Sequence, residues 1–294
     1  MPSQNFIPTI LVTGSSGQLG SEIKLLSKKF SHYKFVFTSR EELPIENSKF
    51  VQSFFETNKI DYCINCAAYT AVDKAESEKK KAFSINADAV GDLARACFEN
   101  QTKLIHISTD YVYDGSSKIP LKENGKLSPI NVYGFTKLKG EELALKNNPT
   151  TLIIRTSWVY SSFGNNFVKT MLRLFNDKEE INVINDQIGS PTYAADIADV
   201  IMQLVSKNEE GSSINGILNF CNSGITNWFE FAEEIKILAN SYCKINPIPT
   251  SSYKTAAKRP PYSVLDTSKI RELLHLNIPH WQDSLKKCME MINQ

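Results

Sequence analysis

Short apolar runs alternate with longer amphipathic stretches through the first half of the chain. Five runs rich in β-branched and aromatic residues indicate buried strands; they lie at 9–13, 34–38, 62–65, 103–107 and 151–155. Apolar residues at helical spacing predict helices between them, over 19–26, 48–58, 82–99 and 131–147. Strands that alternate with helices predict an α/β fold with a doubly wound parallel sheet of the Rossmann type. Ligands bind such sheets beyond the carboxyl ends of the strands.

The regular alternation of expected strands and helices becomes less clear after Ser157. Shorter helices are expected over 164–175, 193–206 and 285–294, and short strands at 181–184 and 217–220. We therefore divide the chain into a first domain, 1–157, and a smaller mixed α/β lobe, mainly 158–294. Segments of the second half are expected to return to the first domain.

Composition excludes several classes of protein. The 294 residues carry a formal net charge of +1 without a basic block, so neither nucleic acid nor a membrane surface is an expected partner. No apolar run approaches the ~20 residues that span a bilayer. Residues 1–8 lack the basic and apolar regions of a secretory leader, and we expect a cytoplasmic protein.

Six cysteines are spaced irregularly. Cys63 and Cys66 are separated by two residues, as in redox or zinc pairs. They fall at the end of an expected strand, where residues three apart point to opposite faces. We interpret both as small buried residues.

A glycine-rich turn follows the first strand directly. It contains Gly14, Gly17 and Gly20, and a helical pattern begins at Leu19. Strand, glycine turn and helix are the context of a dinucleotide-binding loop, although the spacing is G-x-x-G-x-x-G and not G-x-G-x-x-G. We expect the helix N-terminus, with Gln18 and Leu19, to bind the cofactor pyrophosphate.

The end of the second strand indicates which dinucleotide binds. Ser39 and Arg40 stand about where a carboxylate would favour NAD, and an arginine there can bind the 2′-phosphate of NADP. We therefore expect NADPH, with NADH possible. Glu41 and Glu42 follow and weaken this prediction; the alternative is that Arg40 only caps a strand edge. Past the third strand, Ala67, Ala68 and Tyr69 are expected to let a cofactor ribose lie against the backbone.

Tyr133 and Lys137 lie one helical turn apart, so they share a face of the expected helix. An ammonium beside a phenol lowers the phenol's pKa, which would make Tyr133 a proton donor or acceptor. Thr109, at the end of the fourth strand, can bind the same substrate oxygen. This trio suits carbonyl reduction by hydride from a cofactor. The alternative is an ordinary helix start with an exposed Tyr and Lys.

Several stretches, with these two motifs, resemble the dTDP-4-dehydrorhamnose reductase family of the extended short-chain dehydrogenases/reductases. The resemblance extends from about residue 10 to 285 and is carried by NCAAYTAVDKAE (65–76), STDYVYDG (108–115), RTSWVY (155–160), DQIGSPT (186–192) and RPPYS (259–263). It implies NADPH-dependent reduction of the 4-keto group of dTDP-4-dehydro-L-rhamnose.

The resemblance also implies roles for individual residues. Lys137 would hold the nicotinamide ribose, and Asp110, Tyr111 and Trp158 would line the sugar pocket. The first domain would bind NADP, and the second lobe the substrate, wrapped by the Pro-, Ser- and Thr-rich stretch 242–262. Pro44 and Ile45 stand where the family usually carries an Asp-Ile or Asp-Leu pair near the adenine, so Pro44 departs from the family pattern.

Three rivals remain at this point. A nucleotide-sugar dehydratase would carry Asp-Glu after the catalytic Thr, but Tyr111 stands where that Glu would be. A non-catalytic NADP-binding regulatory subunit, like that of methionine adenosyltransferase, belongs to the same family. The substrate could also be another dTDP-4-keto-6-deoxy sugar. Some family members hold a metal with several acidic residues, and Glu22 alone matches one of those positions, so no metal is expected. The chain is expected to be a monomer or a homodimer.

Overall fold

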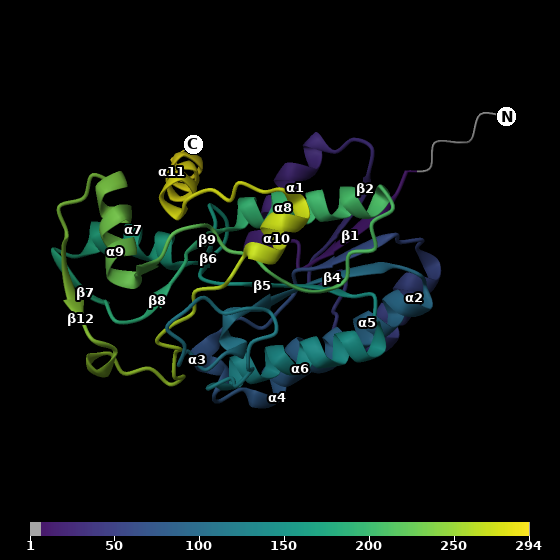
Figure 1. The fold of residues 1–294 in the computed structure, drawn as a ribbon, viewed down its shortest axis with the longest axis horizontal. Helices are drawn as coiled ribbons and strands as arrows, with labels where there is room; N and C mark the ends of the chain where they lie inside the picture. The colour runs from purple at the N-terminus through teal and green to yellow at the C-terminus, as the bar shows by residue number, and fades with distance from the viewer. Residues whose placement is uncertain (1–6, 294) are drawn as a thin grey trace.

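Six parallel strands form the central sheet in the computed structural model, which describes residues 7–293. Their order across the sheet is β2-β1-β3-β4-β5-β10 (Figure 1). Their bounds are β1 (Thr9–Thr13), β2 (Lys34–Thr38), β3 (Tyr62–Asn65), β4 (Lys103–Thr109), β5 (Leu152–Thr156) and β10 (Gly216–Asn219). The chain winds away from β1 in both directions, so the predicted doubly wound α/β sheet is confirmed. Its switch point lies between β1 and β3, where such sheets bind ligands.

Helices cover both faces of this sheet (Figure 1). One face carries α1 (Gln18–Leu26), α8 (Ala194–Glu209) and α10 (Ser268–Leu274). The other carries α2 (Ser48–Thr57), α5 (Ala89–Glu99) and α6 (Val132–Asn147). The edge strand β10 and the helices α8 and α10 come from the second half of the chain, and they complete the layers that the first half begins.

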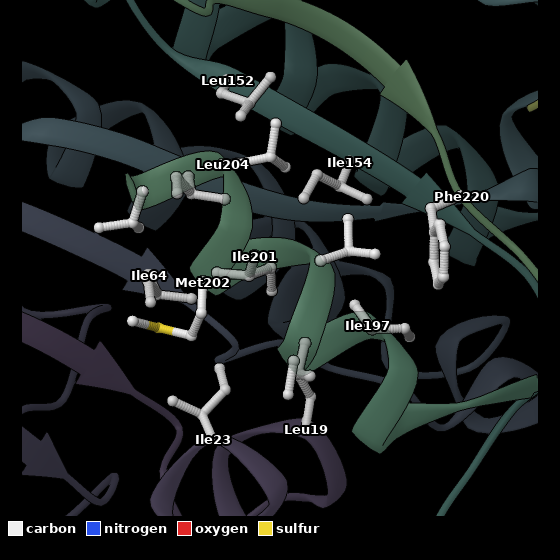
Figure 2. Packing of buried hydrophobic residues seen from close by; sticks show 14 of the residues in the cluster. Leu19, Ile23, Ile64, Leu152, Ile154, Ile197, Ile201, Met202, Leu204 and Phe220 are labelled. Carbon is white, nitrogen blue, oxygen red and sulfur yellow. The ribbon is translucent and has the colours of Figure 1, made fainter. Parts of the chain in front are cut away.

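The largest apolar cluster lies between the sheet, α1 and α8. Figure 2 shows Ile197 and Ile201 of α8 close to Ile154 of β5, with Ile23 of α1 on the other side of the helix. All four side chains are fully buried. Each such side chain contributes about 1.5–3 kcal/mol on burial, so this cluster fixes α1 against the sheet.

The smaller lobe lies at one end of the sheet, on the left of Figure 1. Its strands pair as β7 (Glu180–Ile184) with β12 (Lys244–Ile248), β6 (Val159–Tyr160) with β9 (Thr192–Tyr193), and β8 (Ile188–Gly189) with β11 (Thr226–Asn227). Its helices are α7 (Phe167–Asp177), α9 (Trp228–Leu238) and α11 (Trp281–Ile292). A separate apolar cluster around Phe231 holds them together.

The segment between β3 and β5 contains several short helical turns. They are α3 (Val72–Ala75), α4 (Lys79–Phe83), the π-helical turn η2 (Ser84–Asp88) and the 3₁₀ turn η3 (Asp110–Val112). Two further 3₁₀ turns are η1 (Ser27–Lys29) and η4 (Thr250–Ser252). No helix within residues 7–293 is both long and apolar enough to cross a membrane.

Candidate functional site

A crevice of about 610 Å³ lies at the carboxyl ends of the strands. Its walls include Gly17 from the glycine turn, Thr109 from β4, Tyr133 and Lys137 from α6, and Trp158 from the second lobe. A cavity of about 200 Å³ adjoins it, because both are lined by Gly17, Cys66 and Ala68. A hollow of about 930 Å³ at the far end of the second lobe gathers none of the predicted site residues. The crevice is therefore the candidate site.

The glycines allow the turn after β1 to pack closely. Gly14 has a φ of +63°, and a Cβ there would lie 2.7 Å from the backbone of Ala67. A Cβ on Gly20 would lie 2.5 Å from the carbonyl oxygen of Gly14. Gly17 caps α1, and the first turn of that helix carries no acidic side chain. The helix N-terminus thus presents N–H groups without a competing carboxylate, as a pyrophosphate requires.

Gln18 and Leu19 also line the crevice. The side-chain oxygen of Gln18 accepts a hydrogen bond of 3.0 Å from the Asn166 side chain. Gly164 lies directly over Gln18, since a Cβ on that glycine would be 3.1 Å from Gln18 Cγ. This contact joins the glycine turn to the second lobe across the crevice.

Of the two residues predicted to bind the cofactor after β2, only one reaches the smaller cavity. Arg40 lines the smaller cavity, but Ser39 does not; the Ser39 N–H donates to the Glu42 side chain at 2.7 Å. The Arg40 side chain is 60% exposed and forms an ion pair with Glu46, which lines the same cavity. The acid that competes for Arg40 is thus Glu46, a contact that the sequence did not reveal. Ile45 is buried and forms part of the apolar wall of this cavity.

Beyond β3, Ala67 and Ala68 line the smaller cavity, whereas Tyr69 lines neither. The Tyr69 N–H donates to Asn86 at 2.8 Å, and the Asn86 amide donates back to the Tyr69 carbonyl at 3.0 Å. Asn86 also donates to the Thr136 hydroxyl at 3.2 Å. It belongs to the π-helical turn η2, a feature that often marks functional sites. The predicted continuous helix over 82–99 missed this turn, which ties the β3 loop to α6.

Thr109 is the last residue of β4, and its hydroxyl donates to Asp110 at 3.0 Å and accepts from the Tyr111 N–H at 3.2 Å. Asp110 is 2% exposed, and burial raises its pKa to about 7. Its second oxygen, Oδ2, has no hydrogen-bond partner among the described residues. Tyr111 packs edge-on against Tyr133 with ring centroids 5.6 Å apart. Asp110 and Tyr111 line the crevice beside Thr109.

Tyr133 and Thr109 line the same crevice, and the nearby Thr109 hydroxyl partly lowers the pKa of Tyr133. Burial is the larger effect and raises the pKa of Tyr133 to about 12. The expectation that Lys137 lowers this pKa is wrong for the free crevice, because the side-chain nitrogen of Lys137 is directed at the Ile107 carbonyl oxygen and at His106. A protonated phenol is nevertheless the state that a proton donor needs.

Lys137 is buried, and its Nζ donates to the carbonyl oxygen of Ile107 at 2.6 Å. Nζ also lies 3.3 Å from Nε2 of His106. Burial lowers the pKa of Lys137 to about 8. His106 is a buried histidine, as the sequence indicated, but it contacts a predicted catalytic residue.

The start of α6 is fixed by three contacts. Asn131 caps the helix, accepting from the Gly134 N–H at 2.7 Å. The Val132 N–H donates to Glu76 at 2.9 Å. A Cβ on Gly134 would lie 2.1 Å from the Tyr111 carbonyl oxygen, so only glycine lets α6 approach η3 this closely.

A buried ion pair lies behind the crevice. Arg155 of β5 donates to both carboxylate oxygens of Glu141 on α6, at 2.6–3.2 Å. Ser108 donates to the same carboxylate. Both charged side chains are at most 2% exposed. The Arg155 that opens the RTSWVY stretch is thus structural and holds α6 on β4 and β5.

Two tryptophans form the wall that the second lobe contributes. Trp158 has a φ of +48° and stacks on Trp228, with centroids 3.6 Å apart and planes 9° apart. A Cβ on Gly189 would lie 2.5 Å from the Trp158 indole. Trp158 lines the crevice as predicted. Trp228 was missed, although its place next to the capping Asn227 at a helix start could have indicated it.

All six cysteines are free. Cys63 is buried as interpreted, but Cys66 lines the crevice and is only partly buried. Burial raises its pKa, so the thiol stays protonated. Within residues 7–293, no three His, Cys, Asp or Glu side chains converge as a metal site.

Together these groups can perform carbonyl reduction. The glycine turn and α1 offer a phosphate site. Ala67 and Ala68 form a wall of small side chains, and Arg40 places a cation in the adjoining smaller cavity. These features fit an NADP dinucleotide. Thr109 and Tyr133 lie together at the other end of the crevice with a proton to give.

Comparisons with known proteins identify the family of this chain. A family model described as the RmlD substrate binding domain matches residues 8–294. The chain is 40% identical over 285 residues to dTDP-4-dehydrorhamnose reductase of Aggregatibacter actinomycetemcomitans, covering 94% of this chain and 97% of that protein.

Two solved structures share the fold over nearly their whole length. A dTDP-4-dehydrorhamnose reductase from Clostridium acetobutylicum superposes with a TM-score of 0.92 at 38% identity, covering 97% of this chain and 100% of that one. The enzyme from Bacillus anthracis, solved in complex with NADP, has a TM-score of 0.92 at 36% identity, covering 97% and 99%.

Proposed function

This chain belongs to the dTDP-4-dehydrorhamnose reductase family, and we propose that it reduces the 4-keto group of dTDP-4-dehydro-L-rhamnose with NADPH, giving dTDP-L-rhamnose. The chain is an NADP-dependent oxidoreductase of nucleotide-sugar biosynthesis. The cofactor, when bound, supplies hydride to the carbonyl carbon. The chain's own residues bind and orient both molecules and supply the proton.

The first domain, 1–157, holds the cofactor. The N-terminal end of α1 with Gly14, Gly17 and Gly20 binds the pyrophosphate, since its N–H groups face the crevice without an acid in the first turn. Arg40 binds the 2′-phosphate once released from Glu46. Lys137 is placed to bind the nicotinamide ribose, because it lines the crevice together with Tyr133.

The substrate lies between the two lobes. Thr109 and Tyr133 bind the keto oxygen, and Tyr133 gives that oxygen its proton as hydride adds to the carbon. Asp110 Oδ2, buried and without a partner, is available to a sugar hydroxyl. Trp158, stacked on Trp228, offers an indole face to the sugar.

One observation carries this proposal: the predicted trio and the glycine turn line a single crevice, and Tyr133 is held protonated there. A binding subunit has no need of a buried proton donor beside an aligned hydroxyl. The regulatory-subunit alternative therefore gains no support from the site. Nothing in the crevice distinguishes among dTDP-4-keto-6-deoxy sugars, so the choice of this sugar follows the relatives.

The test is an assay of the purified chain with NADPH and dTDP-4-dehydro-L-rhamnose. We expect NADPH oxidation, read from its absorbance, and dTDP-L-rhamnose identified by mass and NMR. NADPH binding without turnover on any dTDP-4-keto-6-deoxy sugar would support the regulatory role. Turnover on a different sugar of this class would keep the mechanism and change the substrate.

A further inference from the structure

A buried polar chain runs inward from Lys137, away from the crevice. Lys137 Nζ lies 3.3 Å from His106 Nε2, and His106 Nδ1 lies 3.1 Å from the Asn65 side-chain nitrogen. The Asn65 side-chain oxygen then accepts from the Thr13 hydroxyl at 2.7 Å. His106, Asn65 and Thr13 are all fully buried. Water cannot complete this chain from outside, so its donors and acceptors must match one another.

The backbone fixes the orientation of the Asn65 amide. The Ala67 N–H, which can only donate, lies 3.2 Å from Asn65 Oδ1. Turning the amide around would set its NH₂ group against that N–H. Asn65 therefore directs its nitrogen, a donor, at Nδ1 of His106.

This orientation fixes the tautomer of His106. Nδ1 must accept the hydrogen bond from Asn65, so the proton of a neutral imidazole resides on Nε2. Burial lowers the pKa of His106, which agrees with a neutral ring. Nε2 thus presents a hydrogen to Lys137 Nζ.

An ammonium group cannot accept that hydrogen, whereas a neutral amine can. A neutral Lys137 satisfies both contacts at once: its lone pair accepts from His106 Nε2–H, and one of its own hydrogens goes to the Ile107 carbonyl. We propose that His106, oriented by Asn65, is a positioning residue that stabilises the neutral amine form of Lys137 relative to the ammonium in the free crevice. The inference concerns the free chain and does not depend on which substrate is reduced.

The other titratable groups that face Lys137 do not reverse this preference. On α6, Glu141 favours the ammonium, but its carboxylate is already bound by Arg155 and Ser108. Cys66, which follows β3, stays a protonated thiol because burial raises its pKa. Tyr133 is a neutral phenol. The acidic partner is thus shared, and His106 is the group that contacts Nζ directly.

Nuclear magnetic resonance of the cofactor-free chain tests the proposal without any assay of activity. The chain has four histidines, so ¹⁵N spectra can assign the ring of His106. We expect the neutral tautomer with its proton on Nε2. A proton on Nδ1, or a doubly protonated ring near neutral pH, would overturn the proposal, and this measurement needs no variant.

The titration of Lys137, followed by its ¹³Cε shift, gives the second test. In wild type we expect a midpoint well below that of an ordinary lysine. In His106→Gln the amide can turn its oxygen toward Nζ, and the midpoint should rise by about one pH unit or more. His32→Gln, at an exposed site, is the matched control and should leave the midpoint unchanged. A wild-type midpoint equal to that of His106→Gln would show that His106 only fills space.

Asn65→Asp tests the orienting role of Asn65. The aspartate places an oxygen where the amide nitrogen was, so His106 should move its proton to Nδ1 and donate to that oxygen. The ¹⁵N spectrum reports this directly, separately from the added charge. A tautomer that does not change in a folded Asn65→Asp chain would remove Asn65 from the proposal.

Discussion

At the scale of single residues, the proton on Tyr133 is the first determinant of activity. Its pKa of about 12 keeps the phenol protonated through neutral pH, so it can donate as hydride adds to the carbonyl. Tyr133→Phe removes only the hydroxyl. We expect turnover to fall by about 10²-fold or more, as for a lost general acid. The NADPH dissociation constant, measured by fluorescence, should stay within about twofold; near-full turnover would place the proton donor elsewhere.

Asp110 gives a prediction about pH and stability. Burial raises its folded-state pKa to about 7, above the ordinary value of an aspartate. The unfolded chain therefore releases this proton first, and the group costs stability as pH rises from about 4 to above 7. Asp110→Asn keeps the acceptor for Thr109 and cannot ionise. Thermal unfolding should show the variant more stable than wild type by on the order of 2–4 kcal/mol at pH 8–9, and nearly equal at pH 4. The same stability difference at both pH values would show that Asp110 does not titrate as proposed.

Arg40 and Glu46 determine the cofactor preference in opposite directions. Arg40→Ala should raise the Michaelis constant for NADPH by about tenfold, the scale of a charge-assisted hydrogen bond, and that for NADH much less. Glu46→Gln breaks the ion pair that holds Arg40 and should lower the constant for NADPH. Steady-state kinetics with both cofactors measures this. Equal effects on the Michaelis constants for NADPH and NADH would mean that Arg40 only caps the strand edge and does not bind the 2′-phosphate.

At the scale of elements, the close packing of α6 against η3 depends on Gly134, which has no side chain. Gly134→Ala would put a Cβ 2.1 Å from the Tyr111 carbonyl oxygen, so α6 must move and carry Tyr133 and Lys137 with it. We expect a loss of stability of about 1–3 kcal/mol, as for overpacking, and a larger loss of turnover. Gly91→Ala is the matched helical control, because its Cβ would meet chiefly the Leu143 side chain. Equal turnover in the two variants would contradict a positioning role for Gly134.

The sequence predicted the strands and helices well where apolar residues recur with one regular spacing. Strands β1, β2 and β3 and helix α6 have the expected bounds within a residue, because their apolar patterns are regular and Asn131 marks a helix start. The π-helical turn at Asn86 was missed, because the regular apolar spacing of the following helix begins only after this turn. The contact between β10 and β5 joins residues some sixty positions apart and is fixed by packing that no local pattern records.

The same limit applies to the site. The glycine turn and the Tyr–Lys pair could be found because their spacing is local and has a physical reason. The surroundings of Lys137 could not, because His106 and Asn65 come from two other strands and meet it only in the fold. For this reason the sequence placed Lys137 beside the Tyr133 phenol, whereas in the structure it bonds inward.

At the scale of the molecule, the segment 257–266 joins the two lobes. The backbone of Ser263 bonds to Ile188 of the second lobe at 2.8 Å, and Asp266 to Leu121 of the first at 2.9 Å. At its start, Arg259 forms two hydrogen bonds with Asp73 of α3, at 2.6 and 3.0 Å. A sugar bound between the lobes would therefore lie under this segment, next to Tyr111.

The Arg259–Asp73 pair should thus affect the sugar more than the cofactor. Arg259→Ala releases the start of the segment, and we expect the Michaelis constant for the dTDP-sugar to rise about fivefold to tenfold, since a half-exposed bidentate pair contributes on the order of 1 kcal/mol. The NADPH dissociation constant should not change, because the glycine turn lies elsewhere. Lys258→Ala, an exposed neighbouring cation, controls for charge. Adding Asp73→Ala to Arg259→Ala should raise the Michaelis constant for the dTDP-sugar little further. Additive increases would mean that the two residues act separately. The segment would then be held by its backbone hydrogen bonds alone.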